Sequence, residues 1–139
     1  MRAKSIVLTV LILAGCGSTP KPADPPRLKA ALEAESDGAK RYERGDYIVA
    51  TRRFEEAVRI YASIDDATGT SRNRLNLART ELARGQAEAA LLALAGNAGD
   101  PTVDTLMLTA QAQLALDRLD AAQRSLAAAA GQCATPCPQ

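Results

Sequence analysis

The residues with the most reactive side chains in this sequence are three cysteines, Cys16, Cys133 and Cys137. A cysteine thiolate attacks electrophiles, pairs in a disulfide or binds a soft metal, and its surroundings decide which of these it does. The chain contains no histidine, so imidazole cannot act as a general base or complete a zinc site. The chemistry of the cysteines must therefore be inferred from the segments that carry them.

Cys16 ends a short apolar segment near the amino terminus. The segment follows Arg2 and Lys4 and runs from residue 6 to residue 14. A basic start, a short apolar run and small residues at its end are typical of a secretory signal. The run is about half as long as a helix that crosses a bilayer, so we expect no membrane span here. Residues 1–15 are predicted to be a signal peptide.

The stretch Leu13-Ala14-Gly15-Cys16 resembles the lipobox of bacterial lipoproteins. The resemblance implies that Cys16 receives a diacylglyceryl group, that the signal is cut before it, and that its new amino group carries a fatty acid such as palmitate. More than one acyl chain is needed for stable anchoring. Gly17 follows, not aspartate, which by the same resemblance favours the periplasmic face of the outer membrane. The alternative is a chance cysteine after an apolar run.

Cys133 and Cys137 lie four residues apart in a predicted tail, residues 132–139. In an oxidising compartment two such thiols can close a small disulfide ring. Free or intermolecular thiols and a metal site are the alternatives, although the spacing differs from that of the Cys-x-x-Cys redox motif. A thiol-redox or metal-handling lipoprotein that acts through this pair is the alternative function.

Composition excludes several classes of function. The 17 basic and 16 acidic residues nearly balance and aromatic residues make up 3%, so we expect no nucleic-acid partner. There is no phosphate-binding glycine loop and no converging set of catalytic side chains. The neighbouring carboxylates Glu55-Glu56 and Asp65-Asp66 are interpreted as solvated charges. We therefore expect no enzyme activity, no cofactor, no metal and no small-molecule substrate.

Alanine and leucine dominate from Leu28 onward, and both favour helices, which predicts an all-α fold. The helical region repeats three times. Each unit has a small residue in a first helix, a tight turn, a small residue in a second helix and a large apolar residue four positions later. The units carry these as Gly38, Gly45, Ala50 and Phe54; as Ala78, Gly85, Ala90 and Leu94; and as Ala110, Asp117, Ala122 and Leu126. The small residues are expected to let paired helices approach closely, and the large ones to fill the space between pairs.

This pattern resembles the tetratricopeptide repeat (TPR), a helix–turn–helix unit of about 34 residues. The resemblance implies a right-handed α-solenoid of about three units and six helices over residues 27–131, with units at about 31–64, 71–100 and 103–131. Residues 16–26 would form a flexible tether. The first two units are 40 residues apart and the next two 32. The extra residues are placed at 63–69, where they form a long turn or an extra helical turn. This segment is a candidate binding loop or merely a longer connection.

In TPR proteins the first helices line a concave groove that receives a peptide or a partner helix. By resemblance, that face here comprises Leu32, Glu35, Ala39, Tyr42, Arg72, Leu75, Arg79, Leu82, Asp104, Met107, Gln111 and Leu114. The candidate partner-binding residues are Glu35, Tyr42, Arg72, Asn76, Arg79, Met107 and Gln111. Only Asn76 matches the carboxylate clamp of some family members, so that activity is not carried over.

Arg72 and Arg79 lie seven residues apart, on one face of a helix, and neither has an acid four residues away. They are predicted to be free for an acidic partner, with solvated arginines as the alternative. The expected function is a lipid-anchored periplasmic scaffold that binds partner proteins. It resembles the small lipoproteins of envelope assembly: secretin pilotins, outer-membrane protein assembly subunits and adaptors for peptidoglycan hydrolases.

Overall fold

The computed structural model describes residues 25–97 and 99–133, and every regular element within them is an α-helix. The six helices are α1 (Pro26–Glu43), α2 (Tyr47–Ala62), α3 (Ala67–Ala83), α4 (Ala87–Ala95), α5 (Val103–Ala115) and α6 (Leu119–Cys133). The prediction of an all-α chain is confirmed for this part of the sequence. None of these helices is long and apolar enough to cross a membrane.

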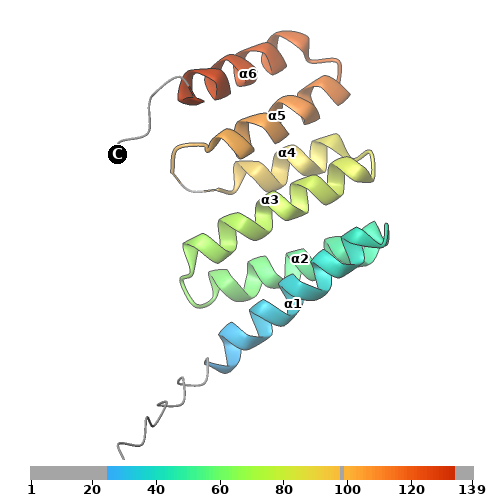
Figure 1. Ribbon diagram of the computed structural model, residues 1–139, viewed down its shortest axis with the longest axis vertical. Coiled ribbons are helices and arrows are strands. Elements are labelled where there is room, and N and C mark those ends of the chain that lie inside the picture. The colour runs from blue at the N-terminus through green and yellow to red at the C-terminus, as the bar shows by residue number, and fades with distance from the viewer. Residues whose placement is uncertain (1–24, 98, 134–139) are drawn as a thin grey trace, which may run out of the picture.

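The helices are stacked in chain order, with α1 at one end of the molecule and α6 at the other (Figure 1). Each helix packs against the next, which gives three hairpins: α1–α2, α3–α4 and α5–α6. The first helices of neighbouring hairpins also touch, α1 against α3 and α3 against α5. These contacts bring α3 against both α1 and α5, although α2 and α4 separate the three helices in the sequence.

The same turn closes all three hairpins. Gly45, Gly85 and Asp117 stand at equivalent positions with φ values of 76°, 75° and 56°. The amide of each donates to the carbonyl three residues earlier, and the next amide donates to the carbonyl five residues before it. A positive φ costs glycine nothing, and aspartate tolerates it better than most residues. The predicted repeat of the turns is therefore present in the backbone.

The small residues of the repeat are buried at the helix contacts, as predicted. Gly38, Ala78 and Ala110 on the first helices are buried, and so are Ala50, Ala90 and Ala122 on the second helices. At Gly38 the approach is close enough that an added Cβ would lie 2.9 Å from the ring of Phe54. A larger side chain here would have to displace that ring, because interiors are close-packed.

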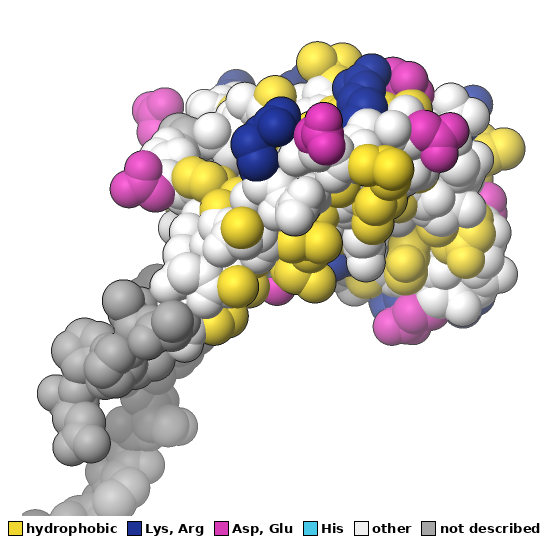
Figure 2. All heavy atoms as spheres, turned by 90° about the horizontal axis from the view of Figure 1, so that it is seen from above, with side chains coloured by type: hydrophobic (Ala, Val, Ile, Leu, Met, Phe, Trp, Pro, Cys, Tyr) yellow, Lys and Arg dark blue, Asp and Glu magenta, His cyan; other side chains and the backbone are white. Residues whose placement is uncertain are grey.

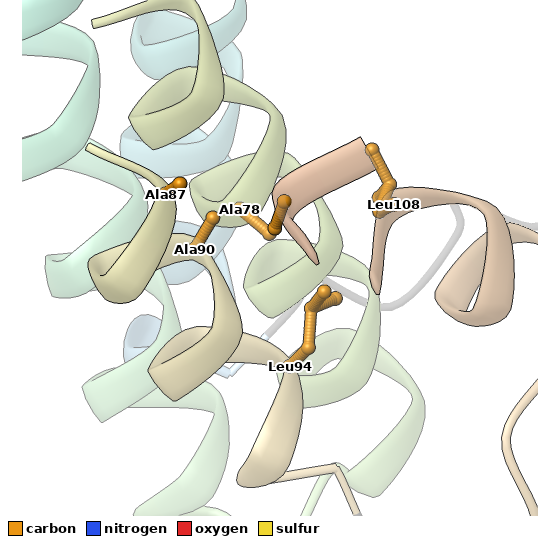
Figure 3. Close-up of a cluster of buried hydrophobic side chains, with 6 residues drawn as sticks. Ala78, Ala87, Ala90, Leu94 and Leu108 are labelled. Carbon is orange, nitrogen blue, oxygen red and sulfur yellow. The ribbon is translucent and has the colours of Figure 1, made fainter. Parts of the chain in front are cut away.

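The large apolar residues of the repeat follow the prediction in two hairpins and not in the third. Phe54 is 2% exposed and Leu94 is 5% exposed. Leu94 points into a cluster that includes Ala78 and Ala90 of its own hairpin and Leu108 of α5 (Figure 3). Leu126 was expected to be buried too, but it is 41% exposed. It lies on α6, and no helix follows α6 within the described residues.

Several helices begin or end a few residues away from the predicted limits. The connection between α2 and α3 is only residues 63–66, since residues 67–69 already belong to α3. The Asp66 carboxylate caps α3 by accepting the amide of Gly69 at 2.8 Å. The longer spacing is therefore taken up mainly by long helices. Of the two forms predicted for residues 63–69, a long turn or an extra helical turn, the structure has a short connection at 63–66 followed by helix at 67–69, so no binding loop spans 63–69. Similarly, α1 begins at Pro26, inside the predicted tether, and α6 extends through Cys133.

Candidate partner-binding face

A cleft of about 200 Å³ opens between α1 and α3. Its lining residues are Ala39, Tyr42, Glu43, Phe54, Asn76 and Arg79. Three of them, Tyr42, Asn76 and Arg79, are among the candidate partner-binding residues. The aromatic rings give the cleft an apolar wall, and the amide and the guanidinium supply hydrogen-bond donors at its rim. Such a site has the chemistry to hold one side chain of a partner together with a neighbouring polar group.

The polar side chains of the cleft are only lightly restrained. The Arg79 Nη1 donates to the Asn76 Oδ1 at 3.3 Å, and its Nη2 lies 3.5 Å from an Asp104 carboxylate oxygen on α5. The prediction that Arg79 is free is therefore wrong in detail, because Asp104 is a partner on the neighbouring first helix. The Asp104 side chain is exposed and the distance is long, so the pair contributes little. Arg79 remains accessible to a partner's carboxylate.

Arg72 is fully engaged. Its Nε donates to the Glu35 Oε1 at 2.6 Å and its Nη2 to the Glu35 Oε2 at 2.8 Å, a two-point pair between α3 and α1. The Tyr61 hydroxyl donates to the same Glu35 Oε2 at 2.8 Å. The Arg72 guanidinium also lies 5.6 Å from the centre of the Tyr61 ring. The prediction that Arg72 is free for a partner is wrong, because Arg72 is paired with Glu35. The search for an acid one helical turn away missed Glu35, which lies 37 residues earlier in the sequence.

The pKa values of this cluster follow from its contacts. The hydrogen bond from Arg72 lowers the pKa of the Glu35 carboxyl, against the opposing effect of burial. Burial, together with Glu35, raises the pKa of the Tyr61 hydroxyl to about 12. The hydrogen bond to Glu35 also raises the pKa of Arg72. At neutral pH the cluster is therefore an ionised pair with a neutral phenol, and it joins α1, α2 and α3.

Met107 and Gln111 are exposed on α5 and do not line the cleft. The structure thus divides the seven candidates into three groups. Tyr42, Asn76 and Arg79 meet at the cleft. Glu35 and Arg72 hold α1 and α3 together. Met107 and Gln111 are exposed on α5 and are not among the residues that line the cleft.

A second polar cluster was missed from the sequence. The buried carboxylate of Glu81 on α3 accepts from the Thr51 hydroxyl of α2 at 2.9 Å. The Arg84 Nη1 donates to both oxygens of Glu81 at 2.9 and 3.0 Å. The three-residue spacing of Glu81 and Arg84 is visible in the sequence. Nothing there indicates Thr51, which lies 30 residues earlier and meets Glu81 only because α2 packs on α3.

Two of the three cysteines, Cys16 and Cys137, lie outside the described residues. Cys133 is the last residue of α6, where its thiol is exposed and makes no disulfide with another described residue. Residues 25–97 and 99–133 contain no group of three or more metal-ligating side chains that could hold an ion. The predicted tail cysteine is therefore a helix residue.

No family model, curated protein or solved structure matches this chain. The interpretation of the cleft therefore rests on the residues of the chain itself. The features that support it are the turn that recurs in each hairpin, the small residues at the helix contacts and the side chains that surround the cleft.

Proposed function

We propose that this protein is a lipid-anchored TPR scaffold at the periplasmic face of the outer membrane, where it holds a partner protein in envelope assembly. The observation that carries the proposal is the cleft between α1 and α3, with Tyr42, Asn76 and Arg79 around it. These residues come from two different hairpins. A site shared between repeats is typical of proteins that use stacked helices as a binding surface.

The TPR interpretation is supported by features that recur at equivalent positions. The turn geometry of Gly45 recurs at Gly85 and Asp117, and the buried small residues recur on both helices of each hairpin. The contacts of α3 with both α1 and α5 agree with a solenoid whose first helices share one face, and the right-handed sense comes from the TPR resemblance alone. Three units meet the usual minimum for a stable array.

The side chains of the cleft favour a peptide or helix as the ligand. An apolar side chain of the partner enters between Tyr42 and Phe54, where it is removed from water. The Asn76 amide pairs with a peptide group beside it, and the Arg79 guanidinium meets a carboxylate. The partner segment is therefore an apolar residue with an acid close to it, presented in an extended or helical conformation.

Photo-crosslinking in living cells tests the proposal. A photoreactive phenylalanine replaces Tyr42 at the rim of the cleft, and the matched control replaces Leu92, which is 78% exposed on α4 and outside the cleft. We expect a discrete adduct from position 42, identified by mass spectrometry, and none from position 92. The added change Arg79→Glu should weaken the adduct. Equal labelling from both positions would refute a binding role for the cleft.

The anchor is tested separately. Cys16→Ser should abolish the acyl mass and leave uncleaved precursor, since the sulfur that receives the lipid is gone. A wild-type chain found soluble in the periplasm and cut at another site would show that the signal has been misassigned.

A further inference from the structure

A second hollow, of about 490 Å³, opens between the start of α1 and the end of α2. These two ends lie side by side in the first hairpin (Figure 1). The hollow shares no lining residue with the cleft between α1 and α3. Its apolar lining includes Ala30 and Ile60, and its polar lining consists of Arg27, Glu56, Arg59 and Ser63.

The two arginines of this hollow have no acidic partner. Arg27 makes one side-chain hydrogen bond, from its Nη1 to the Ser63 hydroxyl oxygen at 3.4 Å. The Arg59 side chain makes no ion pair with any residue that the structure describes, not even with Glu55 one helical turn before it. Because a guanidinium carries five N–H donors, most donors of the two arginines are unused.

The acid of the hollow is already neutralised by another base. The Glu56 Oε2 accepts from the Arg53 Nη1 at 2.9 Å. Arg53 also pairs with Asp37, which has a second base in Arg41. These two acids and two bases balance one another, so the unpaired arginines leave the hollow with an excess of positive charge.

Other surfaces of the molecule do not combine these features. Seen from the α6 end, basic side chains lie beside acidic ones (Figure 2). In the cleft between α1 and α3, Arg79 has Asp104 within 3.5 Å. Two guanidinium groups that line one small volume and have no acidic partner are suited to bind a phosphate or a carboxylate, since their planar N–H forks match the oxygens of such groups.

The rest of the lining favours a phosphate ester over a bare anion. The Ser63 hydroxyl donates to the Ile60 carbonyl oxygen at 2.8 Å while it accepts from Arg27, and it therefore helps to hold that guanidinium in place. Inorganic phosphate would leave the side chains of Ala30 and Ile60 uncovered. A phosphate that carries carbon atoms, as in a lipid headgroup, would cover them as well.

The position of the hollow along the chain indicates where such an ester is found, and this step rests on the proposed lipid anchor at Cys16. Arg27 is 11 residues after Cys16. Eleven residues of fully extended chain span at most about 40 Å. The anchor would therefore keep the hollow near the bilayer surface, where the local concentration of headgroup phosphates is high.

We propose that Arg27 and Arg59 bind the phosphate of an anionic phospholipid headgroup, with Ala30 and Ile60 against its glycerol carbons. The contact gives the protein a second attachment to the membrane beside the acyl chains, and stable anchoring takes more than one attachment. It seats the first hairpin on the bilayer. The cleft between α1 and α3 shares no residue with the hollow, so the two sites are tested separately.

Binding of short-chain lipids to the full chain tests this proposal. The wild type, the double variant Arg27→Ala with Arg59→Ala, and the control Arg44→Ala with Arg52→Ala are purified in one non-ionic detergent. Each is titrated with dihexanoyl phosphatidylglycerol, dihexanoyl phosphatidylcholine and inorganic phosphate, while NMR follows the arginine Nε–H signals. The control removes the same charge from two exposed arginines that do not line the hollow. Circular dichroism checks that all three proteins are equally helical.

We expect phosphatidylglycerol to bind the wild type and the control alike and to shift the signals of Arg27 and Arg59. Its affinity for the Arg27→Ala, Arg59→Ala variant should fall by at least about tenfold, because two charged donors are lost. Phosphatidylcholine should bind the wild type more weakly, since its ammonium group adds a like charge near the arginines. Inorganic phosphate should also bind more weakly, because it covers no apolar side chain.

Three results would overturn the proposal. Equal losses of affinity in the two double variants would show that overall charge, not this hollow, attracts the lipid. Equal binding of both lipids would show that an anionic headgroup is not recognised. Inorganic phosphate that binds as tightly as phosphatidylglycerol would assign the hollow to free phosphate. Because these probes are added in solution, the result does not depend on the acylation of Cys16, which the Cys16→Ser variant tests alone.

Discussion

The junction between the first and second hairpins differs from the junction between the second and third. At the first junction, the ring of Tyr61 packs directly on Gly69, and two polar clusters join the helices. At the second junction, the buried contacts are made by alanine and leucine. The ion pair across it within the described residues is Arg79–Asp104, exposed and 3.5 Å long.

The difference shows which contacts fix the relative positions of the helices most narrowly. Ring-on-glycine packing and two-point ion pairs tolerate only one arrangement of the helices, because small displacements break them. Small apolar side chains fill space equally well in slightly shifted arrangements. The α1–α3 region should therefore be the rigid part of the molecule. The α4–α6 region should be the more adaptable part.

The largest effect is expected from Gly69→Ala at the first junction. An added Cβ would lie 2.3 Å from the Tyr61 ring, which is itself buried and cannot move freely. We expect a loss of about 3 kcal/mol in the free energy of unfolding, the upper range for overpacking. Urea denaturation measures it.

The matched control for Gly69→Ala is Gly131→Ala in α6. An added Cβ there meets no atom within 4 Å, so it should gain about 0.5–1 kcal/mol from helix propensity alone. If both alanine variants are equally stable, the close ring contact at the first junction is absent.

A smaller loss is expected from Ala90→Leu at the second junction. Ala90 is fully buried in the cluster completed by α5, so the added volume must displace neighbours. Because these neighbours are aliphatic and can adjust, we expect about 2 kcal/mol. The neighbouring exposed residue supplies the control, Ala89→Leu, which should change the unfolding free energy by less than about 0.5 kcal/mol. Thermal unfolding curves for Ala90→Leu that overlay those of wild type would show that this part of the repeat has been misaligned.

The two arginines of α3 should behave differently. Arg72→Ala removes a two-point pair from a mostly buried Glu35, and we expect a loss of about 1 kcal/mol after allowing for the solvent around the Arg72 side chain. Arg79→Ala removes only the long pair with Asp104 and should cost less than about 0.5 kcal/mol. Equal losses of unfolding free energy for the two variants in chemical denaturation would mean that the two arginine pairs stabilise their junctions equally, against the prediction.

The smallest effect is the pH dependence of the first junction. The pKa of Glu35 is lower in the folded chain than its ordinary value of 4.5. The stabilisation from this group is therefore complete above that value and is lost as the pH falls through the folded pKa. The difference in unfolding free energy between wild type and Glu35→Gln should shrink from pH 7 to pH 3. Raising the pH through about 12, the pKa of Tyr61, should also destabilise the fold. A difference that is identical at pH 7 and pH 3 would rule out Glu35 as the titrating group.

Much of the fold could be predicted because each repeat is defined by residues that lie close together in the sequence. Gly45, Gly85 and Asp117 mark the turns, and the small residues mark the helix contacts. The polar links could not be predicted, since Glu35 and Arg72 are far apart in the sequence and meet only after the hairpins stack. Leu126 was assigned to the core because a repeating pattern does not indicate whether another helix will cover its last member.

The candidate site was predicted only in part, for a related reason. Counting along the repeat placed Tyr42 and Arg79 on one face, and Asn76 was a candidate because it matches the carboxylate clamp of some TPR proteins. The cleft brings these three residues together. The same counting could not separate Arg72 from Arg79, because both satisfy the same local criterion of lacking an acid one turn away. Their difference lies in what the neighbouring first helices carry, Glu35 on α1 and Asp104 on α5.

Hydrogen exchange of the backbone amides tests most directly the claim that the first junction is more rigid than the second. The amides of α1–α3 should be strongly protected, because ring packing and two polar clusters hold that junction. The amides of α5 and α6 should exchange faster, because the second junction is made by aliphatic contacts and the exposed Arg79–Asp104 pair. Uniform protection from α1 to α6 would contradict the account.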